Sequence, residues 1–300
     1  MKLDMLAATR TIEKTMPFML YRLLLCLGLG LTFLLATLIG AGTLIAFSSF
    51  SKNPSALAGL GAMIGFLGCV YGAYRFRGLW LYTLTARHLA ILAAQFRNDT
   101  IPEGKAQIGY AKELVAARFA SSAALLELDT AISASLHAVS VLHAPLKVAN
   151  PALQKAIDRL MGGLFASHRQ LVLAWHFYVG NDNGWQSAGT AIPCLATHFG
   201  VMLKQRLILT AFEWAGFAAL YWLMLYPTGL VADALPVAVG NWQYVFAALF
   251  AWVLTLAFLQ PISTATLMQG FISEVKDEPE QAESLSRESE AFRDIRTRGQ

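Results

Sequence analysis

Residues 23–47 read LLLCLGLGLTFLLATLIGAGTLIAF, a stretch that holds no charged side chain. A helix rises about 1.5 Å per residue, so about 20 apolar residues can cross a hydrocarbon layer of roughly 30 Å. The stretch is long for a cleaved signal peptide, and no convincing small-residue cleavage site precedes a polar region after it. It therefore predicts a permanent transmembrane helix.

Three further apolar runs of this kind occupy residues 56–74, 207–225 and 242–259. The first two runs of the chain are joined by residues 48–55, and the last two by residues 226–240. Lys52 is the one basic residue in these two connections. Because Lys and Arg collect on the cytoplasmic side of a membrane, we expect both connections outside and both termini in the cytoplasm.

The overall composition points to the same class of protein. Hydrophobic residues make up 56% of the chain and charged residues only 14%, and the mean hydropathy is +0.50. These values lie outside the range of ordinary soluble domains. We predict an all-α fold, a polytopic helical membrane protein of the bacterial inner (cytoplasmic) membrane with about four transmembrane helices plus cytoplasmic or interfacial amphipathic helices.

The middle of the chain is also helical in pattern but carries charges. Residues 105–143 and 151–177 show apolar stripes at helical spacing, interrupted by acidic and basic side chains. We expect these helices to cover one another as a cytoplasmic layer and to lie partly in the membrane interface. If residues 119–143 and 160–179 entered the bilayer, the chain would have six spans; their charges favour four.

Changes in composition divide the chain into four segments. They are an N-terminal segment with a transmembrane hairpin (1–97), cytoplasmic or interfacial amphipathic helices (98–203), a second transmembrane pair with an exit helix (204–275) and a charged cytoplasmic tail (276–300). The tail alternates acidic and basic residues without an aliphatic stripe, so we expect it to stay in solvent, partly as a helix. The net charge of +4 is expected to mark cytoplasmic flanks rather than a nucleic-acid partner.

Several short motifs carry a family resemblance. They are Ile101-Pro102-Glu103-Gly104, Gly109-Tyr110-Ala111-Lys112-Glu113, Trp185-Gln186-Ser187-Ala188, Leu259-Gln260-Pro261, Ala265-Thr266-Leu267-Met268-Gln269 and the polar exit at 274–278. With these motifs, residues 80–298 resemble a group of bacterial polytopic inner-membrane proteins of unassigned function. The end of the chain more distantly resembles the carboxy-terminal part of choline-transporter-like proteins, with Gln260 where that family would carry Glu. The second resemblance implies transport only as an alternative.

Two polar side chains near the ends of the apolar runs are candidates for a function. Glu213 is the one carboxylate inside the third run, and a lone acid in a membrane helix is a functional-site hypothesis. It could instead pair with Lys204 or Arg206, or reach headgroup water. Gln260 places an amide next to Pro261, where the proline frees a backbone carbonyl; such broken helices line sites in transporters, but they also simply bend helices.

Arg206 is a further candidate, as a possible partner of Glu213. Asp129 is the fourth, and it lies two residues after Glu127 in an apolar stretch. Residues two apart point to different faces of a helix, so we expect at most one of these carboxylates to be buried. A structural ion pair is the favoured interpretation of Asp129, with a proton relay as the alternative.

No motif indicates a metal, cofactor or catalytic site. The six His residues include no pair four residues apart, and the three Cys residues stand singly among apolar neighbours. Neither a phosphate-binding glycine loop nor a Gly-x-Ser-x-Gly turn occurs, so we expect no cofactor and no enzyme activity.

Two functional hypotheses remain. The first is a structural or interaction protein that presents its cytoplasmic helices to another membrane protein or to a second copy of itself, with the lipid bilayer as its surroundings. The alternative is a small-solute transporter or channel subunit with a polar path near Glu213 and Gln260. Such a path should bring Glu213, Gln260 and Thr264 onto one surface.

Overall fold

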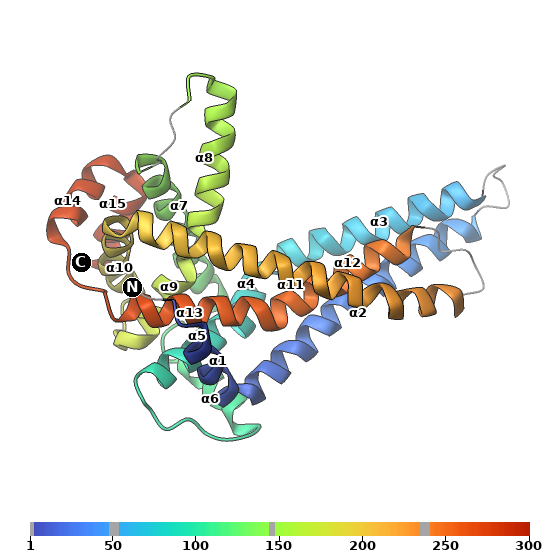
Figure 1. The fold of residues 1–300 in the computed structure, drawn as a ribbon, viewed down its shortest axis with the longest axis horizontal. Coiled ribbons are helices and arrows are strands. Elements are labelled where there is room, and N and C mark those ends of the chain that lie inside the picture. The colour runs from blue at the N-terminus through green and yellow to red at the C-terminus, as the bar shows by residue number, and fades with distance from the viewer. Residues whose placement is uncertain (1–2, 48–53, 144–147, 235–240) are drawn as a thin grey trace. The chain divides into compact units, whose positions relative to one another are not determined.

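The computed structural model describes residues 3–47, 54–143, 148–234 and 241–300. Within these ranges the regular secondary structure is helical and no strand occurs, which confirms the all-α prediction (Figure 1). Five helices in the described chain are long and apolar enough to cross a membrane: Met16–Ala46, Ala56–Arg75, Ser122–Leu142, Phe199–Ala234 and Trp242–Ile272. Four of them contain the four predicted runs, and Ser122–Leu142 is an addition.

The chain folds into two compact units, each assembled from separate stretches of sequence. Unit 1 comprises Met1–Phe18, Gly78–Phe212 and Pro261–Gln300, and unit 2 comprises Met19–Arg77 and Glu213–Gln260. Unit 1 therefore draws residues from all four compositional segments of the sequence.

Unit 2 is built from the long apolar helices. It contains most of α2 (Met16–Ala46) and α11 (Phe199–Ala234), together with α3 (Pro54–Arg75), α12 (Trp242–Leu254) and the π-helical turn η3 (Thr255–Leu259). The predicted connection at 48–55 lies largely outside the described residues.

Glycines let α2 and α3 pack backbone against backbone. A Cβ atom at Gly61 would collide with the carbonyl oxygen of Gly40, and one at Gly65 would collide with the carbonyl oxygen of Ala36. Small residues allow this close approach between membrane helices. Farther from this contact, Phe33, Phe246 and Leu249 form a buried cluster that joins α2 to α12.

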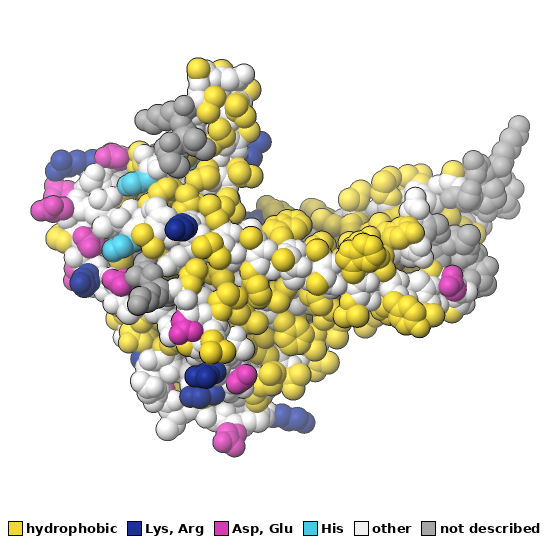
Figure 2. Space-filling model, viewed as in Figure 1, with side chains coloured by type: hydrophobic (Ala, Val, Ile, Leu, Met, Phe, Trp, Pro, Cys, Tyr) yellow, Lys and Arg dark blue, Asp and Glu magenta, His cyan; other side chains and the backbone are white. Residues whose placement is uncertain are grey.

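The outer surface of unit 2 is apolar. Trp222, Leu223, Ile39, Ile64 and Leu67 are each more than half exposed. On the face shown in Figure 2, hydrophobic side chains cover the long helices and charged side chains are sparse. A soluble domain rarely leaves a continuous apolar surface of this kind uncovered.

Helix α11 continues beyond the predicted end of the third run. The sequence predicts a loop from residue 226, but α11 remains helical through Pro227 to Ala234; residues 235–240 of the predicted loop lie outside the described ones. The Thr228 hydroxyl donates to the Met224 carbonyl at 2.7 Å. Side-chain bonds of this type help a membrane helix to tolerate a proline, so Pro227 is not a helix end here.

Unit 1 is a bundle of shorter helices. Its elements, besides the first residues of α11, are α1 (Met5–Lys14), α4 (Arg77–Trp80), the π-helical turn η2 (Leu81–Thr85), α5 (Ala86–Phe96), α6 (Ala106–Ala116), α7 (Ser122–Leu142), α8 (Pro151–Ala166), α9 (Arg169–Val179), α10 (Gly184–Thr197), α13 (Gln260–Ile272), α14 (Pro279–Glu288) and α15 (Glu290–Gly299). The predicted stripe of α7 forms part of its core, with Leu125, Leu128, Ile132, Leu136 and Val139 buried.

Asparagine side chains begin two of these helices. Asn150 accepts backbone N–H bonds at the start of α8, and Asn183 does so at the start of α10, as expected for N-cap residues. The predicted helix over 151–177 is divided at Ser167 and His168 into α8 and α9. Pro193 lies inside α10 without ending it, and the helix ends at Thr197, before His198.

The expectation that the charged tail stays in solvent is wrong. Its helices α14 and α15 pack on α10, and α15 also packs on α7 (Figure 1). Leu285, Phe292 and Ile295 are buried at this contact. These three apolar residues are too widely spaced among charges to form a continuous stripe in the sequence, yet they fall on inward faces of two short helices.

Candidate functional site

The site begins at a break in the hydrogen bonding of the last long helix. The backbone N–H of Gln260 donates to the carbonyl of Thr255, five residues back, which makes η3 π-helical. The Leu256 carbonyl therefore loses the donor that an α-helix would supply, and the next residue, Pro261, has no N–H. An acceptor inside an apolar bundle is left for another group to satisfy.

Arg22 of α2 supplies that group. Its Nε donates to the Leu256 carbonyl oxygen at 2.9 Å, and its Nη2 donates to Oε1 of Gln260 at 3.0 Å. Arg22 is only 5% exposed, and a charge buried among apolar side chains requires such partners. The guanidinium thus joins the start of α2 to the π-helical turn within unit 2.

Sequence reasoning missed Arg22. It directly precedes the apolar run at 23–47, so it reads as an ordinary cytoplasmic flank. The signal that was available is the Gln260-Pro261 pair, which predicts a freed carbonyl. Pairing that acceptor with Arg22 requires knowing that residues more than 230 positions apart meet, as the 238-residue separation of Arg22 and Gln260 shows.

Two of the predicted candidates, Glu213 and Gln260, line one hollow of unit 2. The hollow has a volume of about 340 Å³, and its other lining residues are Trp214, Phe217, Ala248, Trp252, Thr255 and Leu256. A carboxylate, an amide and a hydroxyl therefore share a space walled by aromatic rings. Such a set can hold a small polar group through hydrogen bonds, or can face the polar zone of a bilayer.

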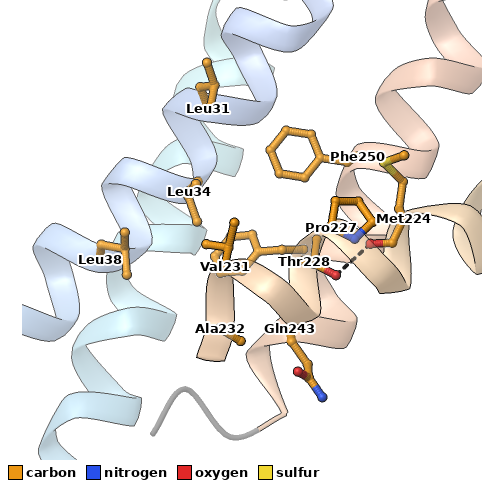
Figure 3. A pocket seen from close by; sticks show the side chains of 11 residues that line it. Leu31, Leu34, Leu38, Met224, Pro227, Thr228, Val231, Ala232, Gln243 and Phe250 are labelled. Atoms are coloured by element: carbon orange, nitrogen blue, oxygen red, sulfur yellow. Dashed lines mark hydrogen bonds between the residues drawn. The ribbon is translucent and has the colours of Figure 1, made fainter. Parts of the chain in front are cut away.

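A second hollow of unit 2, of about 310 Å³, lies between α2, α11 and α12 (Figure 3). Leu31, Leu34 and Leu38 of α2 face Phe250 and Val231 across it. Its polar lining residues are Thr228 and Gln243, and the Thr228 hydroxyl is turned back to the Met224 carbonyl of its own helix. This hollow is apolar in character.

The other predicted residues lie in unit 1. Asp129 is 7% exposed and forms an ion pair with Nε of Arg169 at 3.2 Å. Glu127 is exposed and forms an ion pair with Arg298 of α15. One carboxylate of the two is thus buried and ion-paired, in agreement with the favoured interpretation. Thr264 also belongs to unit 1, where its hydroxyl donates to Oε1 of Gln170 at 2.9 Å.

Arg206, the remaining candidate, lies in the unit 1 part of α11 near His168. Burial lowers the pKa of His168 to about 4; the Phe165 and Met202 carbonyls act in the opposite direction, and the Arg206 cation lowers the pKa further. His168 is therefore neutral at physiological pH. The His168 ring near Arg206 is thus packed and uncharged.

Within the described ranges, no group of three or more His, Cys, Asp and Glu side chains could hold a metal ion. Comparison of the chain with protein-family models, with curated proteins and with solved structures gives no match. The resemblance carried by the short motifs remains a sequence-based prediction.

Proposed function

We propose that the chain is a four-span integral membrane protein of structural or interaction type. In this proposal unit 2 is the membrane anchor, and unit 1 is a cytoplasmic helical domain that binds a partner membrane protein or a second copy. The observation that carries the proposal is the different character of the two outer surfaces. Large apolar side chains such as Trp222, Leu223 and Ile39 are exposed along the long helices of unit 2, whereas unit 1 buries the leucine stripe of α7 and leaves exposed apolar residues mainly on single elements such as α8.

Helix lengths support unit 2 as the spanning part. From Glu213 to Asp233, helix α11 rises about 30 Å at 1.5 Å per residue, and the path from Trp242 to Gln260 rises about 27 Å. Both match a hydrocarbon layer of roughly 30 Å. Arg22, Glu213 and Gln260 then lie at one end of the spans, where polar groups can reach the interface.

The exposed side of α7 argues against a fifth span at Ser122–Leu142. Glu127, Thr130, Ala134 and His137 are among its exposed residues, with Val141 and Leu142 exposed at its end, and 44% of its most apolar window is buried, against 6% for α11. A helix that exposes the Glu127 carboxylate while it buries Leu125, Leu128 and Leu136 would present the wrong face to a bilayer.

The distribution of basic residues supports the orientation. Of the 23 Lys and Arg residues, Lys52 is the one that falls within 23–74 or 207–259. Both connections between spans are therefore external in the proposal, and unit 1 and both termini are cytoplasmic. A bacterial inner membrane is proposed on the motif resemblance.

The interaction function is preferred to transport because a polar path is not continuous along unit 2. Glu213, Thr255 and Gln260 make one hollow polar, but the hollow of Figure 3 is lined almost entirely by apolar residues. The shared hollow of Glu213 and Gln260 is the observation that keeps a small-solute transporter or channel subunit as the second candidate.

Cysteine labelling in spheroplasts tests the topology. In a variant without native cysteines, single cysteines at Asp233, Thr130 and Glu288 are exposed to a membrane-impermeant maleimide. We expect labelling from outside at Asp233 alone, and labelling of the other two only after the membrane is opened. Outside labelling at Thr130 would overturn the four-span proposal.

Flux measurement separates the two functions. In proteoliposomes of the purified full chain we expect K⁺, Cl⁻ and proton leaks equal to those of empty vesicles, for the natural chain and for Glu213→Gln alike. A leak that the natural chain raises and Glu213→Gln lowers would favour the transporter instead.

A further inference from the structure

Helix α8 contacts its own fold through its last turns. Its buried residues are Gly162, Phe165 and Ala166, all in the last turns. A Cβ atom at Gly162 would collide with the His137 ring of α7, so the two helices touch closely there. Residues 151–160, in contrast, contain no buried residue.

The apolar side of α8 points away from unit 1. Leu153, Ile157, Leu160 and Leu164 recur at spacings of three and four residues and form one stripe. Leu153 is 51% exposed and Leu160 is 66% exposed, whereas Ile157 and Leu164 are partly buried. In Figure 2, hydrophobic side chains follow the part of α8 that projects from unit 1.

The projecting turns are built as a helix in their own right. Oδ1 of Asn150 accepts from the N–H groups of Ala152 and Leu153 at 3.0 and 3.3 Å, and Pro151 occupies the favourable first position. Nε2 of Gln154 donates to Asp158 at 2.7 Å. The stripe is therefore presented on a capped helix before anything covers it.

The side opposite the stripe carries two cations. Lys155 and Arg159 lie there with one acid, Asp158, which already accepts from Gln154. Leucines on one face and Lys and Arg on the other, in a helix of low net hydrophobicity, is the composition of helices that lie in the surface of a bilayer. We propose that α8 docks on the lipid surface with Leu153, Ile157, Leu160 and Leu164 in the acyl-chain boundary.

We assign lipid as the occupant of the stripe because the proposed transmembrane spans keep α8 close to a bilayer. This step rests on the membrane-spanning part of the proposed function. A single short helix binds a membrane only weakly, but one held at a bilayer by spans meets it at a high effective concentration. The cations add attraction to anionic headgroups, which α8 would lack toward an ordinary apolar protein surface.

Fluorescence quenching tests the docking on the full chain in vesicles of two parts phosphatidylcholine to one part phosphatidylglycerol. In the variant without native cysteines, an environment-sensitive fluorophore is attached to a single cysteine at Leu160, at Lys155 as the matched control on the other side of α8, or at Ile64 in α3. We expect brominated acyl chains to quench the Leu160 label, and aqueous iodide to quench the Lys155 label.

The outcomes separate the inference from the proposal beneath it. Quenching of the Ile64 label by bromolipid without quenching at Leu160, together with iodide access there, overturns the docking and leaves the spans intact. Protection of Leu160 from both quenchers, growing with the protein-to-lipid ratio, assigns the stripe to a second copy and also overturns it. An Ile64 label that bromolipid does not reach contradicts unit 2 as the membrane anchor.

Neutralising the two cations of α8 gives a second test of the docking. With the label at Leu160, Lys155→Gln and Arg159→Gln should each shift the equilibrium between docked and undocked α8 about fivefold toward undocked in the anionic vesicles. The same variants should change nothing in pure phosphatidylcholine. Equal effects in both lipids would contradict the role of the two cations.

Discussion

Arg22 donates to the Leu256 carbonyl and to Gln260, so one guanidinium satisfies acceptors on a turn that its own helix leaves open. The planar fork of Arg suits two acceptors at different positions, whereas the ammonium of Lys is a compact point charge. The Leu256 carbonyl needs this donor for two reasons. The Gln260 N–H donates to Thr255 and not to Leu256, and the next residue, Pro261, has no N–H. A residue that looks like a flank in sequence is thus part of the packing of unit 2.

Replacing Arg22 by Met should destabilise unit 2, because the Leu256 carbonyl and the Gln260 amide would lose a charged donor at similar side-chain volume. We expect a loss on the order of 1–3 kcal/mol in the free energy of unfolding. Arg22→Lys should recover part of it. Unfolding by dodecyl sulfate in mixed micelles measures the stability of both variants. Adding Gln260→Leu to the natural chain and to Arg22→Met gives the interaction free energy between Arg22 and Gln260, which we expect at about 1 kcal/mol. Zero coupling would contradict the bond.

Two buried histidines make unit 1 sensitive to acid. Burial is the main cause that lowers the pKa of His168 to about 4, and burial followed by the Arg118 cation does the same for His176, opposed by Asp182. In the unfolded chain both rings protonate near 6.5. The unfolded state therefore binds more protons between pH 6.5 and 4, so stability is full above pH 6.5 and falls as the pH drops toward 4.

Acid unfolding in detergent should show this dependence. Each histidine should contribute a loss of roughly 3 kcal/mol between pH 6.5 and 4, measured as a falling midpoint of thermal unfolding. His168→Gln should make the midpoint of thermal unfolding less dependent on pH by the contribution of one histidine, even if it lowers stability at pH 7. An unchanged pH dependence in His168→Gln would show that His168 does not stay neutral on folding.

At the scale of elements, the apolar runs predict the long helices well, because about 20 consecutive apolar residues match the length that a helix needs to cross a hydrocarbon layer. Ends and turns are predicted less well. Pro227 reads as a helix end but lies inside α11, and Leu285, Phe292 and Ile295 read as isolated but meet α10 and α7. The burial of the three tail residues depends on groups distant in sequence, which local patterns do not contain, whereas Pro227 is accommodated by a side-chain bond within its own helix.

The α2–α3 contact gives a prediction with an internal control. Gly61→Ala should separate the two helices, because its Cβ would occupy the position of the Gly40 carbonyl oxygen, which is backbone and cannot move aside. Gly68→Ala, on the same helix, meets nothing within 4 Å and should be neutral or slightly stabilising. We expect Gly61→Ala to cost about 1–3 kcal/mol, read from dodecyl sulfate unfolding. Equal stability of the two variants would mean that the backbones are not in contact.

For the whole molecule, the two units have opposite relations to their surroundings. Unit 2 turns large apolar residues outward and keeps Arg22 inside, while unit 1 buries the leucine stripe of α7 and exposes leucines on α8. The sequence predicts the two classes of helix, and its charges favour keeping residues 119–143 out of the bilayer. Helix α7 nevertheless has the length and composition of a span, and the direction in which its side chains point distinguishes it from α3. The exposure of the α8 stripe and the hollow that Glu213 and Gln260 line also depend on how the helices pack.

One cation placed on α3 and on α7 distinguishes the two surroundings. Ile64 is 57% exposed near the middle of α3, so Ile64→Lys would put an ammonium against acyl chains and should reduce membrane integration by about 3 kcal/mol on the scale of insertion energies. Thr130 is exposed near the middle of α7, and Thr130→Lys should be tolerated if that face meets water. The measurement is the carbonate-resistant, detergent-soluble yield of each full-length variant. A fall for both would make α7 a fifth span, whereas a fall for neither would remove α3 from the membrane; a fall for Ile64→Lys alone is the result that four spans require.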